Sequence, residues 1–318
     1  MTVEASRRQA LPQLSGGGLF VTDGGLETEL IFHDGIELPC FAAFPLLEKP
    51  DGRSRLRRYY DGYLAIAREH GAGFIIETPT WRANPDWATR LGYAPKQLDG
   101  FNRAAVSLAE EVRAAAAADG ITAVVSGCVG PRGDGYDPGN AMTPEEAERY
   151  HAIQIGTFAS TTADQVTAIT MTNAEEAIGI VHAASAAGIP AAISFTVETD
   201  GRLPTGQPLR EAIEQVDAAT GARAAYFMVN CAHPAHFADS LAPDGPWRRR
   251  IVGLRANAST RSHAELDDAT ELDEGDPVDL GARHVALRDR LSTVTVLGGC
   301  CGTDARHVAA IVSSWSAD

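Results

Sequence analysis

Eight short apolar segments, rich in β-branched residues, recur along the 318-residue chain. Their apolar residues are nearly continuous rather than alternating, as in strands that are buried on both faces of a parallel sheet. Parallel neighbours need crossover connections, so this repetition predicts an α/β fold. The segments are residues 19–24, 73–80, 122–130, 165–171, 191–197, 225–231, 250–257 and 294–301.

The intervals between these segments carry helix signals. Thr143 begins a capping box with Glu146 and has proline at the first helical position, and Asn173 with Glu176 repeats the pattern. Apolar residues also share one helical face at Val308, Ile311, Val312 and Trp315.

Eight strand–helix repeats in about 300 residues predict a single (β/α)8 TIM barrel with a parallel eight-stranded core. We expect it to span residues 18–318, after a flexible leader at 1–17. The alternative is an open doubly wound sheet, but "DGGLETEL" after the first segment lacks the G-x-G-x-x-G phosphate fingerprint.

Composition narrows the class of partner. A formal net charge of -15 argues against nucleic acid or an anionic membrane. The five cysteines, without a recognisable export signal, indicate reduced thiols in the cytoplasm. We expect small-molecule ligands and a monomer or small homo-oligomer.

Reactive side chains gather at the ends of the predicted strands, where TIM barrels place their active sites. Asp23 follows the first strand, Glu77-Thr78 ends the second, Cys231 follows the sixth and Cys300-Cys301 the eighth. Three thiolates facing one another across the barrel mouth would make a three-ligand zinc site with one open position. From spacing alone, buried packing cysteines are an equal alternative, whereas a vicinal disulfide is disfavoured by ring strain.

Other candidates have simpler explanations. Cys40 and Cys128 are expected to be packing residues. His233 is expected to cap a helix or lie at the surface rather than bind metal, and His263 is given no role. The polar segment 258–279 is either a lid or a solvated insertion.

The motifs "VTDGGLETEL", "MVNCAHP" and "VLGGCCGT" together resemble the homocysteine S-methyltransferase family, in the same order and over about residues 18–316. The resemblance implies a zinc-binding barrel whose metal ligands are Cys231, Cys300 and Cys301. It also implies that a small sulfonium or ammonium donor, such as S-methylmethionine, methylates a thiol that is homocysteine by default. The acceptor thiol would occupy the open zinc position and lose its proton there.

The resemblance also suggests substrate contacts. Asp23 matches the family's acidic residue at the amino-acid site, although it could instead stabilise the turn before Gly24-Gly25. Cation–π contacts to the donor would come from aromatic residues near strand ends. The expected substrate-binding residues are Asp23, Gly24, Gly25, Glu77, Thr78, Trp81, Phe195, Glu198 and Asn230, with Tyr136 as a further aromatic candidate.

One position departs from the family pattern. Ile169 stands where many members carry the glutamate that holds the substrate's ammonium group. Either Glu198 or Glu77 replaces it, or the acceptor is not an ordinary α-amino-acid thiol. The rivals are therefore a relative with another thiol or donor, and a non-catalytic zinc- or thiol-binding protein.

Overall fold

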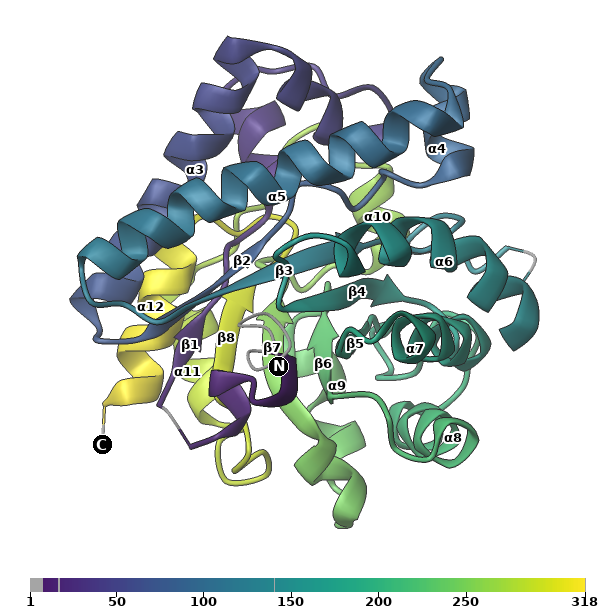
Figure 1. Cartoon of the computed structure of the whole chain (residues 1–318). Coiled ribbons are helices and arrows are strands. Elements are labelled where there is room, and N and C mark those ends of the chain that lie inside the picture. The colour runs from purple at the N-terminus through teal and green to yellow at the C-terminus, as the bar shows by residue number, and fades with distance from the viewer. Residues whose placement is uncertain (1–7, 17, 140, 318) are drawn as a thin grey trace.

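The computed structural model describes residues 8–16, 18–139 and 141–317. Eight strands pair in parallel and in sequence order, and β8 pairs with β1 to close a barrel (Figure 1). The strands are β1 Phe20–Val21, β2 Gly73–Glu77, β3 Ala123–Val129, β4 Gln165–Met171, β5 Ala191–Phe195, β6 Tyr226–Asn230, β7 Ile251–Ala256 and β8 Val296–Gly299. The predicted TIM-barrel fold is confirmed.

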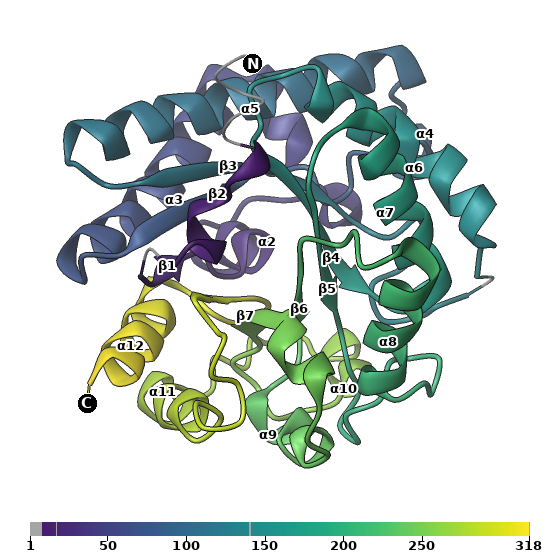
Figure 2. The same cartoon turned by 60° about the horizontal axis from the view of Figure 1, so that its bottom comes forward.

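Helices surround the ring of strands, as the view in Figure 2 shows. The longest are α3 Pro50–Glu69 and α5 Pro95–Ala118. The others are α2 Leu26–Thr28, α4 Pro85–Arg90, α6 Pro144–Ala159, α7 Ala174–Ala187, α8 Leu209–Thr220, α9 Pro234–Phe237, α10 His263–Asp267, α11 Pro277–Val285 and α12 Ala305–Ser316. None of the helices described is long and apolar enough to cross a membrane.

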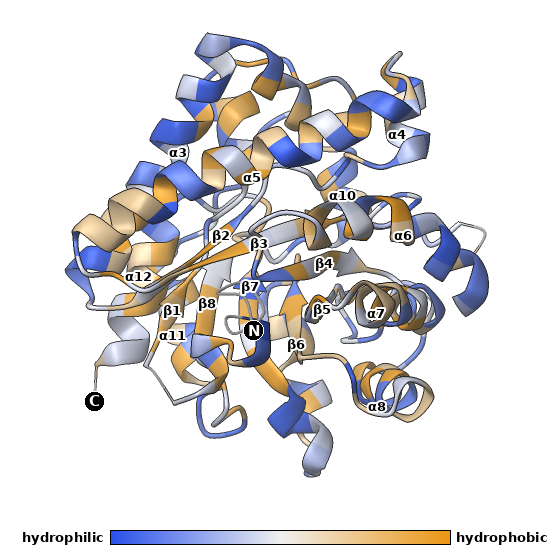
Figure 3. Cartoon of the chain, in the orientation of Figure 1, coloured by the Kyte–Doolittle hydropathy of each residue, from blue (hydrophilic) through white to orange (hydrophobic). Residues whose placement is uncertain are grey.

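Along each strand, residues that face the barrel interior alternate with residues that face the surrounding helices. Inward residues form one cluster, which includes Phe20, Ile75, Tyr226 and Val296. Their neighbours belong to the larger core between strands and helices. This two-sided burial explains the continuous apolar segments, and Figure 3 shows the strands β1 and β2 mainly in the hydrophobic colour.

Residues 11–14 close the amino-terminal end of the barrel. Leu11 joins the inward cluster, and the Gln13 side chain donates to Gln165 Oε1 at 2.8 Å. Gln165 in turn donates to the Tyr226 hydroxyl at 3.0 Å. This end of the barrel is therefore filled by apolar and amide side chains, and open space lies at the other end. Of the predicted leader, residues 1–7 and 17 lie outside the described residues.

Both predicted helix starts are present. Thr143 Oγ1 accepts from Glu146 N at 3.2 Å, and Thr143 N donates back to the Glu146 carboxylate at 2.9 Å. Asn173 Oδ1 accepts from Glu176 N at 2.8 Å. These bonds satisfy amide groups that have no partner within α6 and α7.

Replacing Thr143 by alanine removes the side-chain half of the α6 capping box. We expect the free energy of unfolding to fall by about 1 kcal/mol, because an amide of the first turn loses its acceptor. Urea denaturation measures this change. Thr143→Ser keeps the hydroxyl and is the control; an equal loss in the serine variant would show that the cap is not the cause.

Candidate active site

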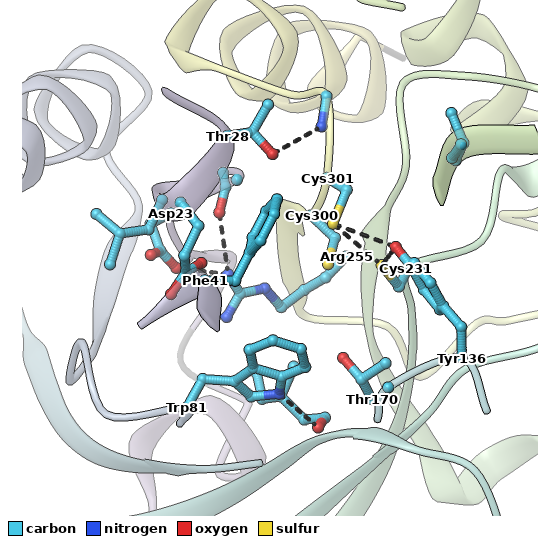
Figure 4. Close-up of a pocket in the computed structure, with 18 of the residues that line it drawn as sticks. Asp23, Thr28, Phe41, Trp81, Tyr136, Thr170, Cys231, Arg255, Cys300 and Cys301 are labelled. Atoms are coloured by element: carbon cyan, nitrogen blue, oxygen red, sulfur yellow. Dashed lines mark hydrogen bonds and ion pairs between the residues drawn. The ribbon is translucent and has the colours of Figure 1, made fainter. Parts of the chain in front are cut away.

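Three cysteine thiols meet at the carboxyl end of the barrel. Cys231 directly follows β6, and Cys300 and Cys301 directly follow β8. Their sulfur atoms all lie within 4.8 Å of one another, and those of Cys231 and Cys301 are 3.4 Å apart (Figure 4). The structure therefore brings together the three cysteines that the sequence predicted.

The backbone at these positions is tightly turned. Cys231 has a φ of 53°, and its amide donates to Arg255 O at 3.1 Å. Gly302, directly after Cys301, has a φ of +75°, which a residue without a Cβ adopts at little cost. At Gly25 a Cβ would lie 2.6 Å from Cys300 O, so only glycine permits this approach of the first loop to the cysteine loop.

The sulfur geometry suits zinc. Two sulfurs bound to one tetrahedral zinc at about 2.3 Å lie about 3.8 Å apart, which is within the spread seen here. Hydrogen bonds from the Cys231 and Cys301 thiols hold the pKa of Cys300 well below its ordinary value, and Arg255 and Asn230 lower it further. A thiolate is thus favoured at the centre of a soft ligand set.

Asn230, the last residue of β6, contacts the cysteine cluster from the barrel interior. Its amide nitrogen lies 3.6 Å from the Cys300 sulfur and donates to Thr170 Oγ1 at 2.8 Å. Its oxygen accepts from Thr170 N at 3.0 Å and from the Ser194 hydroxyl at 2.7 Å. Thr170 has a φ of 64°, so Asn230 also holds a strained turn at the end of β4.

Tyr136 contacts the cluster from the loop after β3. Its hydroxyl lies 3.0 Å from the Cys231 sulfur and 3.4 Å from that of Cys301. The Tyr136 ring stacks on His263, with centroids 4.0 Å apart and an interplanar angle of 14°. His263 also lies 2.7 Å from Cys231 O and 3.0 Å from the Glu198 carboxylate. The expectation that His263 has no role is therefore wrong for the structure, since His263 contacts both Tyr136 and the Cys231 backbone.

A cavity of about 360 Å³ opens beside the sulfurs. The segment 258–279 contributes Leu266 and Leu272 to its wall, and Phe32 and Phe41 lie at its rim with exposed fractions of 44% and 46%. Ile169 is also in the wall, and its carbonyl accepts from Trp81 Nε1 at 3.2 Å.

Asp23 is held by two partners in the cavity. Its carboxylate lies 2.6 Å from Arg255 Nη2 and accepts from the Tyr59 hydroxyl at 3.1 Å. Burial raises the pKa of Asp23, while Arg255 and Tyr59 oppose that rise. Arg255 therefore compensates the charge of Asp23, and each of the two Asp23 oxygens already has one partner before a ligand binds.

The sequence reasoning missed Arg255 and Glu27. Arg255 lies within an apolar strand, and such a buried charge was the available signal. Glu27 lines the cavity, and burial raises its pKa to about 7. Both residues change the electrostatics of the site.

The other predicted contacts divide into two groups. The cavity wall includes Gly24, Gly25, Glu77, Thr78 and Trp81. Within the described part of the chain it does not include Phe195, Glu198 or Asn230, which lie behind or beside it. Phe195 packs against Phe227 in the core between strands and helices, with centroids 6.1 Å apart.

Three further predictions can be judged. Cys128 is buried and also lines the cavity, whereas Cys40 is exposed, so the packing prediction is wrong for Cys40. Cys40 lies in a surface turn at a φ of 57°. His233 accepts from Ala235 N at 3.3 Å and caps α9, as expected.

The fold and the site together define a TIM barrel with a three-thiol cluster at its carboxyl rim. The sequence model of the homocysteine S-methyltransferase family matches residues 20–314, so the chain belongs to this family and is an enzyme of it. No curated protein matches the chain.

Solved structures agree on the fold. The metallated form of the homocysteine methyltransferase MmuM from Escherichia coli is 21% identical, and the match covers 96% of this chain and 99% of that one with a TM-score of 0.72. Its oxidised form matches over the same shares at 21% identity with a TM-score of 0.74.

Replacing Glu77 by glutamine tests its buried carboxyl. Burial raises the pKa of Glu77 from 4.5 to about 7, so between these values the folded protein holds a proton that the unfolded chain has released. The wild type must therefore lose roughly 2–3 kcal/mol more stability than the glutamine variant as the pH rises through this window, because Glu27, whose pKa burial also raises to about 7, titrates in both proteins. Urea unfolding at about pH 5 and about pH 8 measures the difference. A constant difference between the two proteins would contradict this account of Glu77.

Proposed function

We propose that the protein is a zinc-dependent S-methyltransferase that moves a methyl group from a small sulfonium or ammonium donor to a thiol. Homocysteine is the default acceptor, giving methionine. The observation that carries the proposal is the three-sulfur cluster of Cys231, Cys300 and Cys301, which opens directly onto a cavity of small-molecule size.

The chain's own residues prepare this chemistry. Zinc held by the three cysteines would lower the pKa of an acceptor thiol, so that a thiolate is available at neutral pH. Asn230 and Tyr136 stabilise the cysteine sulfurs through the contacts described above. The apolar part of the cavity wall includes Ile169, Trp81 and the loop residues Leu266 and Leu272.

The wall also suits a cationic donor. Glu27, Asp267, Glu271 and Asp273 place carboxylates around the cavity, and attraction to them favours a sulfonium or ammonium methyl group. Aromatic faces at Phe32 and Phe41 line the entrance. Trp81 has the Arg82 guanidinium 4.2 Å from its ring centroid, so one face of this ring is already in use.

A second candidate function is methyl transfer to another thiol, and Ile169 favours it because its side chain cannot neutralise an ammonium group. For either reaction we propose a cytoplasmic monomer or small homo-oligomer. The five free cysteines favour this reducing compartment.

Zinc content and methyl transfer test the proposal together. Protein purified without added metal should contain about one zinc per chain, as a single three-cysteine site requires. Cys301→Ala should lose it, and Cys40→Ala, which removes an exposed thiol away from the cluster, should retain it. The zinc protein should form methionine from S-methylmethionine and homocysteine. No zinc in fresh, reduced wild-type protein would overturn the proposal, and zinc without turnover would leave the second candidate, to be assayed with other thiols.

Tyr136→Phe tests the support of the sulfur cluster. Removing the hydroxyl that lies 3.0 Å from Cys231 should weaken zinc binding by about tenfold, as loss of groups that orient metal ligands commonly does. Competition with a zinc chelator measures the affinity. Tyr150→Phe is the matched control. It removes a tyrosine hydroxyl on α6 that donates to Asn84 Oδ1. Equal affinity in wild type and Tyr136→Phe would contradict a role for the hydroxyl.

A further inference from the structure

The position that departs from the family pattern leaves an unanswered need in the cavity. An α-amino-acid ligand brings an ammonium and a carboxylate, and both require partners when they leave water. Ile169 offers no charge, and Asp23 is engaged by Arg255 and Tyr59. Glu198, the other acid considered from the sequence, pairs with His263 and is not in the cavity wall.

Of the other charged residues in the cavity wall, two belong to strands of the barrel. Glu77 lies two residues beyond Ile75, which faces the barrel interior, and it is the last residue of β2. Arg255 follows Leu254, which faces the helices, so strand alternation turns Arg255 inward. Both residues line the cavity, and their exposed fractions are 4% and 5%.

Each of these two side chains has a buried polar atom without a partner. Among the described residues, neither Glu77 Oε2 nor Arg255 Nη1 makes a hydrogen bond, although the opposite charges of the two side chains attract each other. A buried polar atom left in this state destabilises the protein, and more so when the group is charged. Unmatched groups of this kind, in the wall of a cavity, are typical of a site completed by its ligand.

The rest of Arg255 is firmly held. Its Nε donates to Gly299 O at 3.1 Å. Its Nη2 pairs with Asp23 at 2.6 Å, and Figure 4 shows these two side chains together. These contacts fix the guanidinium plane and leave Nη1 as the edge without a partner. Such a preorganised donor suits a carboxylate, whose oxygens accept charge-assisted hydrogen bonds.

We propose that Glu77 and Arg255 bind the zwitterionic head group of an α-amino acid, with its ammonium on Glu77 and its carboxylate on Arg255 Nη1. This site replaces the one that Ile169 abolishes, and it moves ammonium recognition from β4 to β2. It rests on the proposed function only in requiring that the amino acid carry the sulfur toward the cysteines. Burial raises the pKa of Glu77, and a neighbouring ammonium would favour its ionised form.

Three ligands without a free thiol test the head-group site on the zinc-loaded full chain. L-methionine has both charged groups, 4-(methylthio)butanoate lacks the ammonium, and 3-(methylthio)propylamine lacks the carboxylate. Isothermal titration calorimetry should show methionine binding at least about tenfold tighter than either analogue, since each analogue leaves one buried atom unpaired. An analogue that binds as tightly as methionine, or methionine that does not bind, would overturn the proposal.

Variants assign each contact. Glu77→Gln should weaken methionine about tenfold and leave 4-(methylthio)butanoate unchanged. Arg255→Lys keeps the charge beside Asp23 and should weaken methionine while leaving 3-(methylthio)propylamine unchanged. Glu69→Gln, which removes an exposed carboxylate on α3, is the control and should change none of the three. Loss of methionine and both analogues in equal proportion in Glu77→Gln would contradict its assignment.

The wild-type comparison needs neither variant, so it stands even if Arg255→Lys does not fold. It also separates this proposal from the proposed function. If methionine binds more tightly than both analogues but no methyl transfer is seen, the proposed reaction is overturned and the head-group site stands. If methyl transfer to homocysteine is seen but methionine binds no more tightly than the analogues, the head-group site is overturned and the reaction stands.

Discussion

Closure of the barrel between β1 and β8 is the constraint on which the site depends. Only two residues of each strand pair there, Phe20 with Val296 and Val21 with Leu297. The seam then continues beyond the strands, where Gly299 N donates to Asp23 O at 2.9 Å and Gly25 N to Thr303 O at 3.0 Å. Arg255 crosses it by bonding to both Asp23 and Gly299. The bonds that close the sheet therefore also hold the segment of Cys300 and Cys301 next to Asp23 in the cavity wall.

The barrel interior near the carboxyl ends of the strands is polar, because its side chains support the site rather than form part of the apolar core. Ser126 and Thr167 share a hydrogen bond of 2.7 Å below Glu77, and Asn230 links Thr170, Ser194 and Cys300. A satisfied network of this kind fixes side-chain positions, while the two unmatched atoms of Glu77 and Arg255 mark where binding energy is available. The barrel thus separates rigid support from the groups left for a ligand. The family to which the chain belongs implies that small-molecule substrates bind in such a cavity.

The sequence could predict what depends on spacing and period. Eight apolar segments determine the barrel, and a barrel brings the ends of β6 and β8 to one rim, so the three cysteines follow. It could not predict contacts that depend on which face a residue takes at a strand end. Phe195 was expected near the donor, but Ser194 faces inward to Asn230 and Phe195 faces the helices. His263 and Glu198 meet across 65 residues of chain through loop packing, for which no local pattern gives a signal.

The central claim is that the three cysteines form a metal centre with a position open to an acceptor thiol. X-ray absorption at the zinc edge tests it most directly, on the zinc-loaded protein with and without homocysteine. The account predicts about three sulfur neighbours near 2.3 Å, rising to about four when homocysteine is added. Fewer than three sulfurs, or a sulfur number that homocysteine leaves unchanged, would contradict it.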